Sequence, residues 1–245
     1  MEARGAFLLG NTAADVRAIT GQHRSETHFY RLSEHDAPSA DEALVATHPA
    51  LANPRVLPTS QAAFVSGYRV HLAYDERWAR DLFMPLYWNG PDWPDRLTFT
   101  VHHNALRVCL DRRALDWILA DSEAVKALRN VKPSGWLPFV PDAVLREWRD
   151  WLMAQIDAPD QVATLEVFAE RMGVAVSRLA AQVARIEAGA YDAVPGLEAA
   201  LARYAVRAQH DALESLVRYW RIKPEVELTP QIAKSPEIIQ EYQAK

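Results

Sequence analysis

The chain is poor in cysteine and glycine. One cysteine, Cys109, occurs in 245 residues, which excludes an internal disulfide framework and a zinc site built from several cysteines. Only nine glycines are present, and no two of them are separated by a single residue. The glycine-rich loop that binds dinucleotides is therefore absent, as are the GxSxG and HExxH motifs of common hydrolases.

Long apolar runs and an excess of positive charge are also missing. No apolar run approaches the roughly 20 residues that a membrane-spanning helix needs. The amino-terminal segment 1–11 has an early glutamate and only a short apolar patch, so it does not resemble a signal peptide. The formal net charge is −5, whereas nucleic-acid-binding surfaces are usually basic. We expect a cytoplasmic protein without a membrane partner, and a nucleic-acid partner is disfavoured.

Alternating apolar residues in the first half of the chain predict strands. The alternating residues are Tyr68, Val70, Leu72 and Tyr74, then Leu97, Phe99 and Val101, then Leu106, Val108 and Leu110. The last two runs are separated by His102-His103-Asn104, which predicts a β-hairpin. The predicted fold is therefore α+β, with a small antiparallel sheet of about three strands in the amino-terminal half.

The second half has the periodicity of helices. Asp111 is the predicted cap of a helix that extends to about Arg129, and further helices are expected after Pro141 and after Pro195 or Gly196. The resulting division of the chain has three parts: an α+β part with the hairpin over 1–132, an all-helical part over 133–222, and an extended, proline-spaced arm over 223–245.

Two short amphipathic helices are predicted around Gly173, within Thr164–Ile186. In a DNA-binding helix-turn-helix, the second helix would direct four residues at bases and phosphates. These residues are Ser177, Arg178, Gln182 and Arg185. The seven arginines between Thr164 and Arg221 are balanced by seven acidic residues, so a structural helical corner is favoured over nucleic-acid contact.

Histidines could supply a metal site or a general base. The candidates are His102 and His103 in the predicted hairpin, and His28, His35 and Asp36 in the irregular amino-terminal part. None has the spacing of helical metal ligands, and neighbours on a strand point to opposite faces. Exposed loop histidines are the favoured interpretation, so no metal, cofactor or catalytic residue is assigned.

Tryptophans in proline-bearing connectors indicate a surface for protein contacts. The candidate protein-binding residues are Trp88, Trp93, Trp136, Pro224, Pro230 and Pro236. Together with the arm, they predict a non-catalytic accessory or adaptor subunit of a larger cytoplasmic assembly, with another protein chain as its partner. Two alternatives stay open: a helix-turn-helix nucleic-acid-binding protein, and an enzyme with a histidine and carboxylate site.

Overall fold

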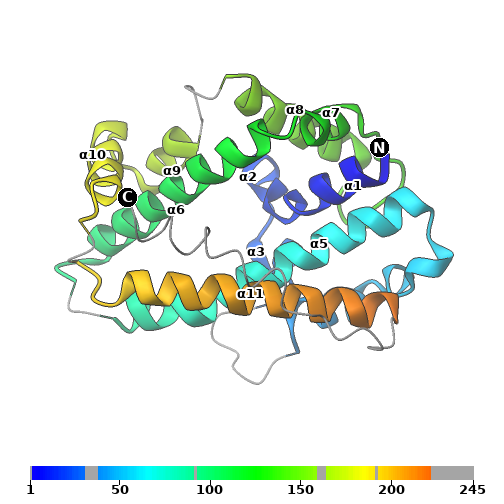
Figure 1. Ribbon diagram of the computed structural model, residues 1–245, viewed down its shortest axis with the longest axis horizontal. Helices are drawn as coiled ribbons and strands as arrows, with labels where there is room; N and C mark the ends of the chain where they lie inside the picture. Colours follow the sequence, from blue (N-terminus) through cyan, green and yellow to red (C-terminus); the bar gives the residue numbers. More distant parts are fainter. Residues whose placement is uncertain (1, 31–37, 91–92, 159–163, 191–192, 222–245) are drawn as a thin grey trace.

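A computed structural model describes residues 2–30, 38–90, 93–158, 164–190 and 193–221, and all regular elements in these ranges are helical (Figure 1). The elements are α1 (Glu2–Gly10), η1 (Ala13–Val16), α2 (Arg17–Thr20), α3 (Arg24–His28), α4 (Ala40–Thr47), η2 (Pro49–Leu51), η3 (Pro54–Val56), α5 (Thr59–Trp78), η4 (Ala79–Trp88), α6 (Arg96–Leu119), α7 (Ser122–Asn130), α8 (Asp142–Asp157), α9 (Thr164–Met172), α10 (Val176–Glu187) and α11 (Leu197–Trp220). No helix in the described ranges is both long and apolar enough to cross a lipid bilayer.

The predicted antiparallel sheet does not occur in the described residues, so the α+β assignment is wrong. The segment from Tyr68 to Tyr74, predicted as a strand, lies inside α5. In α5, the apolar side chains that are 0% exposed are those of Phe64, Val65, Tyr68 and Leu72, and their spacings of one, three and four residues follow one face of a helix. A run of seven residues was too short to distinguish this period from simple alternation.

The predicted hairpin over Leu97–Leu110 is also wrong, because this segment is the first half of α6. His102-His103-Asn104 continues the helix instead of turning the chain. No glycine or proline interrupts the segment, so nothing ends the helix there. Val101, Ala105 and Val108 are buried, and their spacings of four and three residues again match a helix face.

The predicted helix boundary at Asp111 is also wrong. Asp111 lies within α6 and is not a cap. The single helix predicted from Asp111 to Arg129 is instead the end of α6 followed by α7. The side chain of Asp121 caps α7, since its Oδ1 accepts a hydrogen bond from the Ala124 amide at 3.0 Å.

The later helices follow their sequence signals. α8 begins directly after Pro141. α9 and α10 flank Gly173, whose φ of +63° ends the first helix. α11 begins after Gly196 and is 24 residues long. The arm predicted over 223–245 lies outside the described residues.

Two clusters of buried side chains hold the helices together. The first combines α1, α5, α7 and α8 with Tyr219 near the end of α11. The second combines η4, α6, α9 and α10 with the start of α11. Figure 1 shows α11 running along α5, and α9 and α10 beside α6. The first cluster contains residues from both sides of position 132. The predicted boundary between the parts 1–132 and 133–222 therefore lies inside one buried core.

Helices α1 and α5 approach each other so closely that their backbones touch. A Cβ atom added to Gly67 would lie 2.0 Å from the Phe7 carbonyl oxygen, and one added to Gly10 would lie 2.0 Å from the Phe64 carbonyl oxygen. Only glycine fits at such a crossing. Asn11 follows α1 directly. The close approach of the helices places Asn11 against the face of α5 that carries His71. His71 lies one turn beyond Gly67.

We predict that Gly67→Ala destabilises the protein. In a solvent-exposed helix this change would stabilise the helix by about 1 kcal/mol. Here the added methyl group must displace the α1 backbone, so we expect the free energy of unfolding to fall by about 1–3 kcal/mol. Urea denaturation measures it, and the exposed Ala199→Gly in α11 calibrates the helix-propensity term. A neutral or stabilising Gly67→Ala would show that the two helices are not in backbone contact.

Candidate functional site

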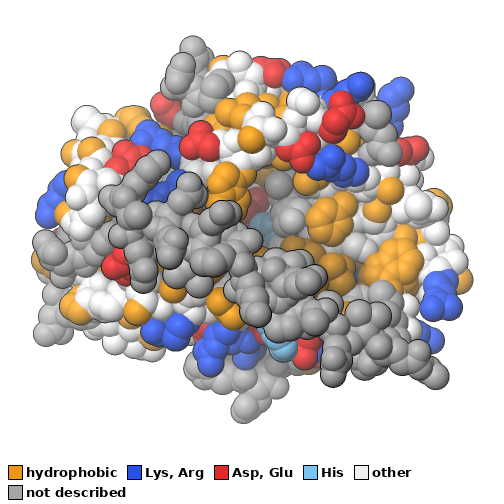
Figure 2. All heavy atoms as spheres, viewed as in Figure 1, with side chains coloured by type: hydrophobic (Ala, Val, Ile, Leu, Met, Phe, Trp, Pro, Cys, Tyr) orange, Lys and Arg blue, Asp and Glu red, His pale blue; other side chains and the backbone are white. Residues whose placement is uncertain are grey.

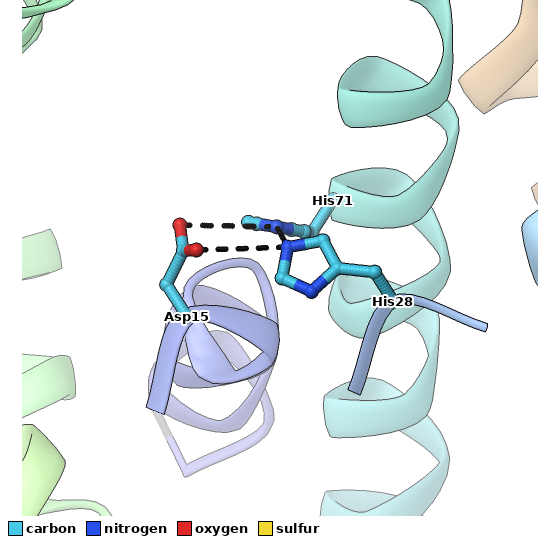
Figure 3. Close-up of side chains that lie close together, drawn as sticks. All are labelled: Asp15, His28 and His71. Atoms are coloured by element: carbon cyan, nitrogen blue, oxygen red, sulfur yellow. Dashed lines mark hydrogen bonds and ion pairs between the residues drawn. The ribbon is translucent and has the colours of Figure 1, made fainter. Parts of the chain in front are cut away.

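Asp15, His28 and His71 converge in the first half of the chain (Figure 3). Asp15 lies in η1, His28 is the last residue of α3, and His71 lies in the middle of α5. One ligand atom from each residue lies within 4.8 Å of the other two. Figure 3 shows the two carboxylate oxygens of Asp15 directed at the two imidazoles.

The distances between these atoms match the space around a small metal ion. His28 Nε2 lies 3.6 Å from Asp15 Oδ1 and 3.5 Å from His71 Nε2, and His71 Nε2 lies 3.9 Å from Asp15 Oδ2. In tetrahedral zinc sites, with zinc–ligand bonds of about 2.0–2.1 Å, two ligand atoms are about 3.4 Å apart. The three side chains therefore stand close to the separations that coordination requires.

The backbone fixes the position of His28. It ends α3, and the following residue, Phe29, has a φ of +58° that stops the helix. This left-handed conformation is unfavourable for a bulky side chain. The Phe29 ring is held by edge-to-face contacts with His48 and Phe139. The surrounding core therefore stabilises a strained turn directly beside a cluster residue.

The far nitrogen of each imidazole has its own partner, which determines where the ring proton resides. His71 Nδ1 lies 2.9 Å from the Asn11 carbonyl oxygen, and a carbonyl only accepts, so the proton is inferred to be on Nδ1. His28 Nδ1 lies 3.0 Å from Thr27 Oγ1. The Thr27 hydroxyl can accept from this nitrogen while it donates to the Arg24 carbonyl at 3.4 Å.

When both ring protons lie on Nδ1, as in a metal-bound state, the centre of the cluster contains only acceptors. The Nε2 lone pairs of His28 and His71 face each other and the Asp15 carboxylate. Lone pairs at such distances repel one another unless a proton or a cation lies between them. Metal-ligating histidines usually donate their other N–H to a protein oxygen in this way. The arrangement therefore suits a metal ion.

Asp75 extends the cluster from the next turn of α5. Its Oδ2 lies 3.9 Å from His28 Nε2. It accepts a hydrogen bond from the Tyr30 hydroxyl at 2.6 Å and forms an ion pair with Arg24. Burial alone would raise the pKa of Asp75, but Arg24, and after it the two histidines, keep this pKa below its usual value. Asp75 therefore adds a second negative charge beside the cluster.

The pKa shifts of Asp15 and His28 favour an ionised carboxylate and a neutral imidazole at these two residues. Burial alone would raise the pKa of Asp15, but its hydrogen bond with His28 and the charges of His71 and Arg107 hold it well below its usual range. Burial lowers the pKa of His28, and the two carboxylates oppose this effect. Ionised carboxylate and neutral imidazole are the states that bind metal ions.

The cluster opens into a cleft formed by two adjoining cavities, of about 680 Å³ and 410 Å³. Both cavities are lined by Asn11, His71, Arg107, Asp111 and Ala114. Figure 2 shows a hollow near the middle of this face, with histidine and acidic atoms at its floor and apolar side chains beside it. The cluster thus lies at a wall shared by two spaces.

The two cavities differ in their walls. The larger cavity has an aromatic wall that includes Tyr74, Trp78 and Tyr204. The smaller cavity is lined mainly by aliphatic residues and tryptophans of α1, α6 and α8, among them Leu115 and Trp151. The cleft therefore offers apolar surface on both sides of a polar centre.

The predicted histidine sites are partly corrected by the structure. His28 and His102 are 0% and 3% exposed, so the interpretation as exposed loop histidines is wrong for both. His102 accepts or donates a hydrogen bond with the Tyr87 hydroxyl at 3.1 Å, and His103 Nε2 accepts one from Trp78 at 2.9 Å. His35 and Asp36 lie outside the described residues. Of the singled-out histidines that the structure describes, only His28 belongs to the cluster.

Of the predicted protein-binding tryptophans, Trp88 and Trp93 both contact Phe99, whereas Trp136 belongs to the first buried cluster. Trp88 is 48% exposed, whereas Trp136 is 3% exposed and lies against Phe64. Trp93 is half-buried and stacks on Tyr87. The predicted residues Pro224, Pro230 and Pro236 lie outside the described part of the chain.

The predicted nucleic-acid residues lie on the outer side of α10. Ser177, Arg178 and Arg185 are exposed and Gln182 is partly exposed. They lie apart from the cleft, because none of them lines either cavity.

Asp15, His71 and Asp75 were not predicted as site residues. One local signal existed: His71 and Asp75 are four residues apart, and in a helix such residues share a face. Asp15 and His28 carry no comparable spacing, since only the folded chain brings η1, α3 and α5 together.

Comparison with known proteins gives no guide to the function. No protein-family model matches the chain, and neither a curated protein nor a solved structure is detectably similar to it. The function is therefore argued from the geometry of the site.

We predict that the burial of His102 makes the protein less stable in acid. Burial, followed by the charge of Arg185, lowers the pKa of His102 to about 4, whereas an unfolded histidine has a pKa of about 6.5. The unfolded chain thus binds the proton more tightly, and stability is lost as the pH falls from about 6.5 to about 4. At about pH 4 the protonation of this one group lowers the free energy of unfolding by about 3 kcal/mol.

Urea denaturation at several pH values measures this loss. His102→Gln should reduce the drop in unfolding free energy between pH 7 and pH 4 by about 2–3 kcal/mol, while His210→Gln, at an exposed position, should not change it. An unchanged pH profile in His102→Gln would contradict the assignment.

Proposed function

We propose that this protein is a metal-dependent hydrolase whose metal is held by Asp15, His28 and His71, with Asp75 beside them. The observation that carries the proposal is the convergence of potential metal-ligand atoms at 3.5–3.9 Å, with both imidazole Nδ1 atoms already bonded elsewhere. A cation bound between these atoms would be held by all three side chains, with the other nitrogen of each imidazole bonded to a protein oxygen.

The ligand set favours a divalent transition metal ion of the zinc type. Two imidazoles and one carboxylate are the protein ligands of many catalytic zinc sites, which keep a further position open for water. Such an ion lowers the pKa of a bound water and polarises an ester oxygen. The same ligands also bind iron(II) in oxygenases, so the identity of the metal is part of the test.

The cleft supports an ester substrate that carries an anionic group and an apolar part. Arg107 lines both cavities, and its guanidinium lies over the Phe168 ring at 4.7 Å. No described carboxylate lies within ion-pair distance of Arg107, so this cation is free to meet an anionic group. The apolar walls on both sides would bury the rest of the substrate.

The adaptor function and the nucleic-acid-binding function remain predictions. The half-exposed Trp88 is compatible with protein contacts, and α10 presents arginines to solvent. Neither feature has the convergence of chemical groups seen at Asp15, His28 and His71, which is why the hydrolase is preferred.

We predict that the untagged protein, stripped with a chelator, binds about one Zn²⁺ per chain at the cluster. Isothermal titration calorimetry with Zn²⁺, Mg²⁺ and anaerobic Fe²⁺ measures affinity and stoichiometry. Asp15→Asn keeps the shape of the side chain but removes its charge. It should weaken zinc binding by about 100-fold or more, since even an outer partner of a metal ligand contributes 10–100-fold.

The matched control is His210→Gln, because His210, Asp211 and Glu214 form the other metal-capable group among the described residues, and it is largely exposed. This variant should bind zinc like the parent chain. Equal losses in both variants, or no binding by the parent chain, would refute the metal site. Preference for Fe²⁺ over Zn²⁺ would keep the site and refute the hydrolase.

We further predict that ester hydrolysis depends on the bound metal. The probes are 4-nitrophenyl acetate and bis(4-nitrophenyl) phosphate, whose cleavage is followed by the colour of the released 4-nitrophenolate. Chelation should abolish turnover of the cleaved probe, Zn²⁺ should restore it, and Asp15→Asn should lower it by about 100-fold or more. Turnover that survives chelation would place the activity outside the metal site.

A further inference from the structure

Asp111 lies in the cleft without a structural task. It is on α6, and it is one of the five residues that line both cavities. Its carboxylate is exposed within the cleft. Asp111 forms no hydrogen bond or ion pair with any residue in the part of the chain that the structure describes, although Arg107 lies one turn earlier on α6 and attracts its charge.

Asp111 differs in its contacts from Asp15 and Asp75. The other acids near the cluster are occupied, since Asp75 is bound by Arg24 and Tyr30 and Asp15 faces the histidines. Acids that serve only stability are normally paired or fully solvated. Asp111 is not paired, and its exposed side chain lines the cleft, which leaves it free to contact a molecule bound there.

We propose that Asp111 is a catalytic residue that gives a proton to the leaving group during hydrolysis. This proposal rests on the proposed function, because the cluster must activate the attacking water. The water oxygen forms a bond to the acyl carbon or phosphorus, and the bond from that atom to the leaving oxygen breaks. The electron pair stays on the leaving oxygen, which takes the proton from Asp111 and leaves as an alcohol. The proton that the attacking water releases then restores Asp111 through the water in the cleft.

The electrostatics of the cleft suit this role. Withdrawal of the Asp111 carboxyl from bulk water raises its pKa to about 6, Asp15 adds to the rise and Arg107 opposes it. A catalytic acid works best when its pKa lies near the working pH. The titratable and charged groups that line the cleft around Asp111 are Asp15, Arg24, Tyr30, His71, Tyr74, Asp75, His103, Arg107, Arg171 and Tyr204.

Leaving-group dependence separates proton donation from a merely structural role. 4-Nitrophenolate leaves without help, whereas phenolate and alkoxides need a proton. In the zinc-loaded protein, Asp111→Asn should lower kcat for a phenyl ester by about 100-fold and for the matching 4-nitrophenyl ester by less than about fivefold. The matched control is Asp116→Asn, on the same helix but lining neither cavity, and it should leave both rates unchanged.

A second readout does not depend on activity. The carboxyl ¹³C signal of Asp111, assigned by its loss in Asp111→Asn, should titrate near pH 6 in the folded chain, and calorimetry should show unchanged zinc affinity in the variant. Equal losses on both esters, no loss, or titration below about pH 4 would overturn the role of Asp111 while leaving the hydrolase intact. A zinc-loaded parent chain that cleaves neither ester would overturn both proposals, with the metal site tested separately by its affinity.

Discussion

The contact between the backbones of α1 and α5 is the constraint on which the described structure depends. Gly10 and Gly67 remove the side chains that would keep the two helices apart. Gly5, at the other end of α1, lies equally close to the Ala127 carbonyl of α7. α1 is therefore enclosed by its neighbours at backbone distance, and the turn after it is held against α5. This turn supplies both the Asn11 carbonyl that orients His71 and, through η1, the carboxylate of Asp15.

The cluster departs from what stability alone would favour. Three side chains that can bind a metal converge there, and a strained residue, Phe29, follows His28 directly. Natural proteins depart from local stability rules mainly at functional sites, where the cost is compensated elsewhere. Here the compensation comes from the aromatic contacts of Phe29 and from Arg24 and Tyr30, which neutralise and anchor Asp75.

The cleft lies between the two buried clusters and takes a wall from each. His71 on α5 belongs to the side of the first core, whereas Arg107 and Asp111 project from α6, which belongs to the second. The polar groups are thus held by two separately packed units, with apolar walls around them. Such a layout positions charged groups on rigid helices, which is what a catalytic site requires.

The sequence by itself determined the helices whose apolar period extends over several turns and whose ends carry local signals. Pro141 before α8, Gly173 between α9 and α10, and Gly196 before α11 act through the few residues beside them, so their effect can be read without the fold. The segments 68–74 and 97–110 were misassigned because short runs fit a strand as well as a helix, and burial in the tertiary structure decides between them. The site was decided only by the tertiary structure. Asp15, His28 and His71 come from three elements separated along the chain, and what joins them is the packing of α1 on α5, which depends on shape complementarity between distant residues and leaves no local pattern.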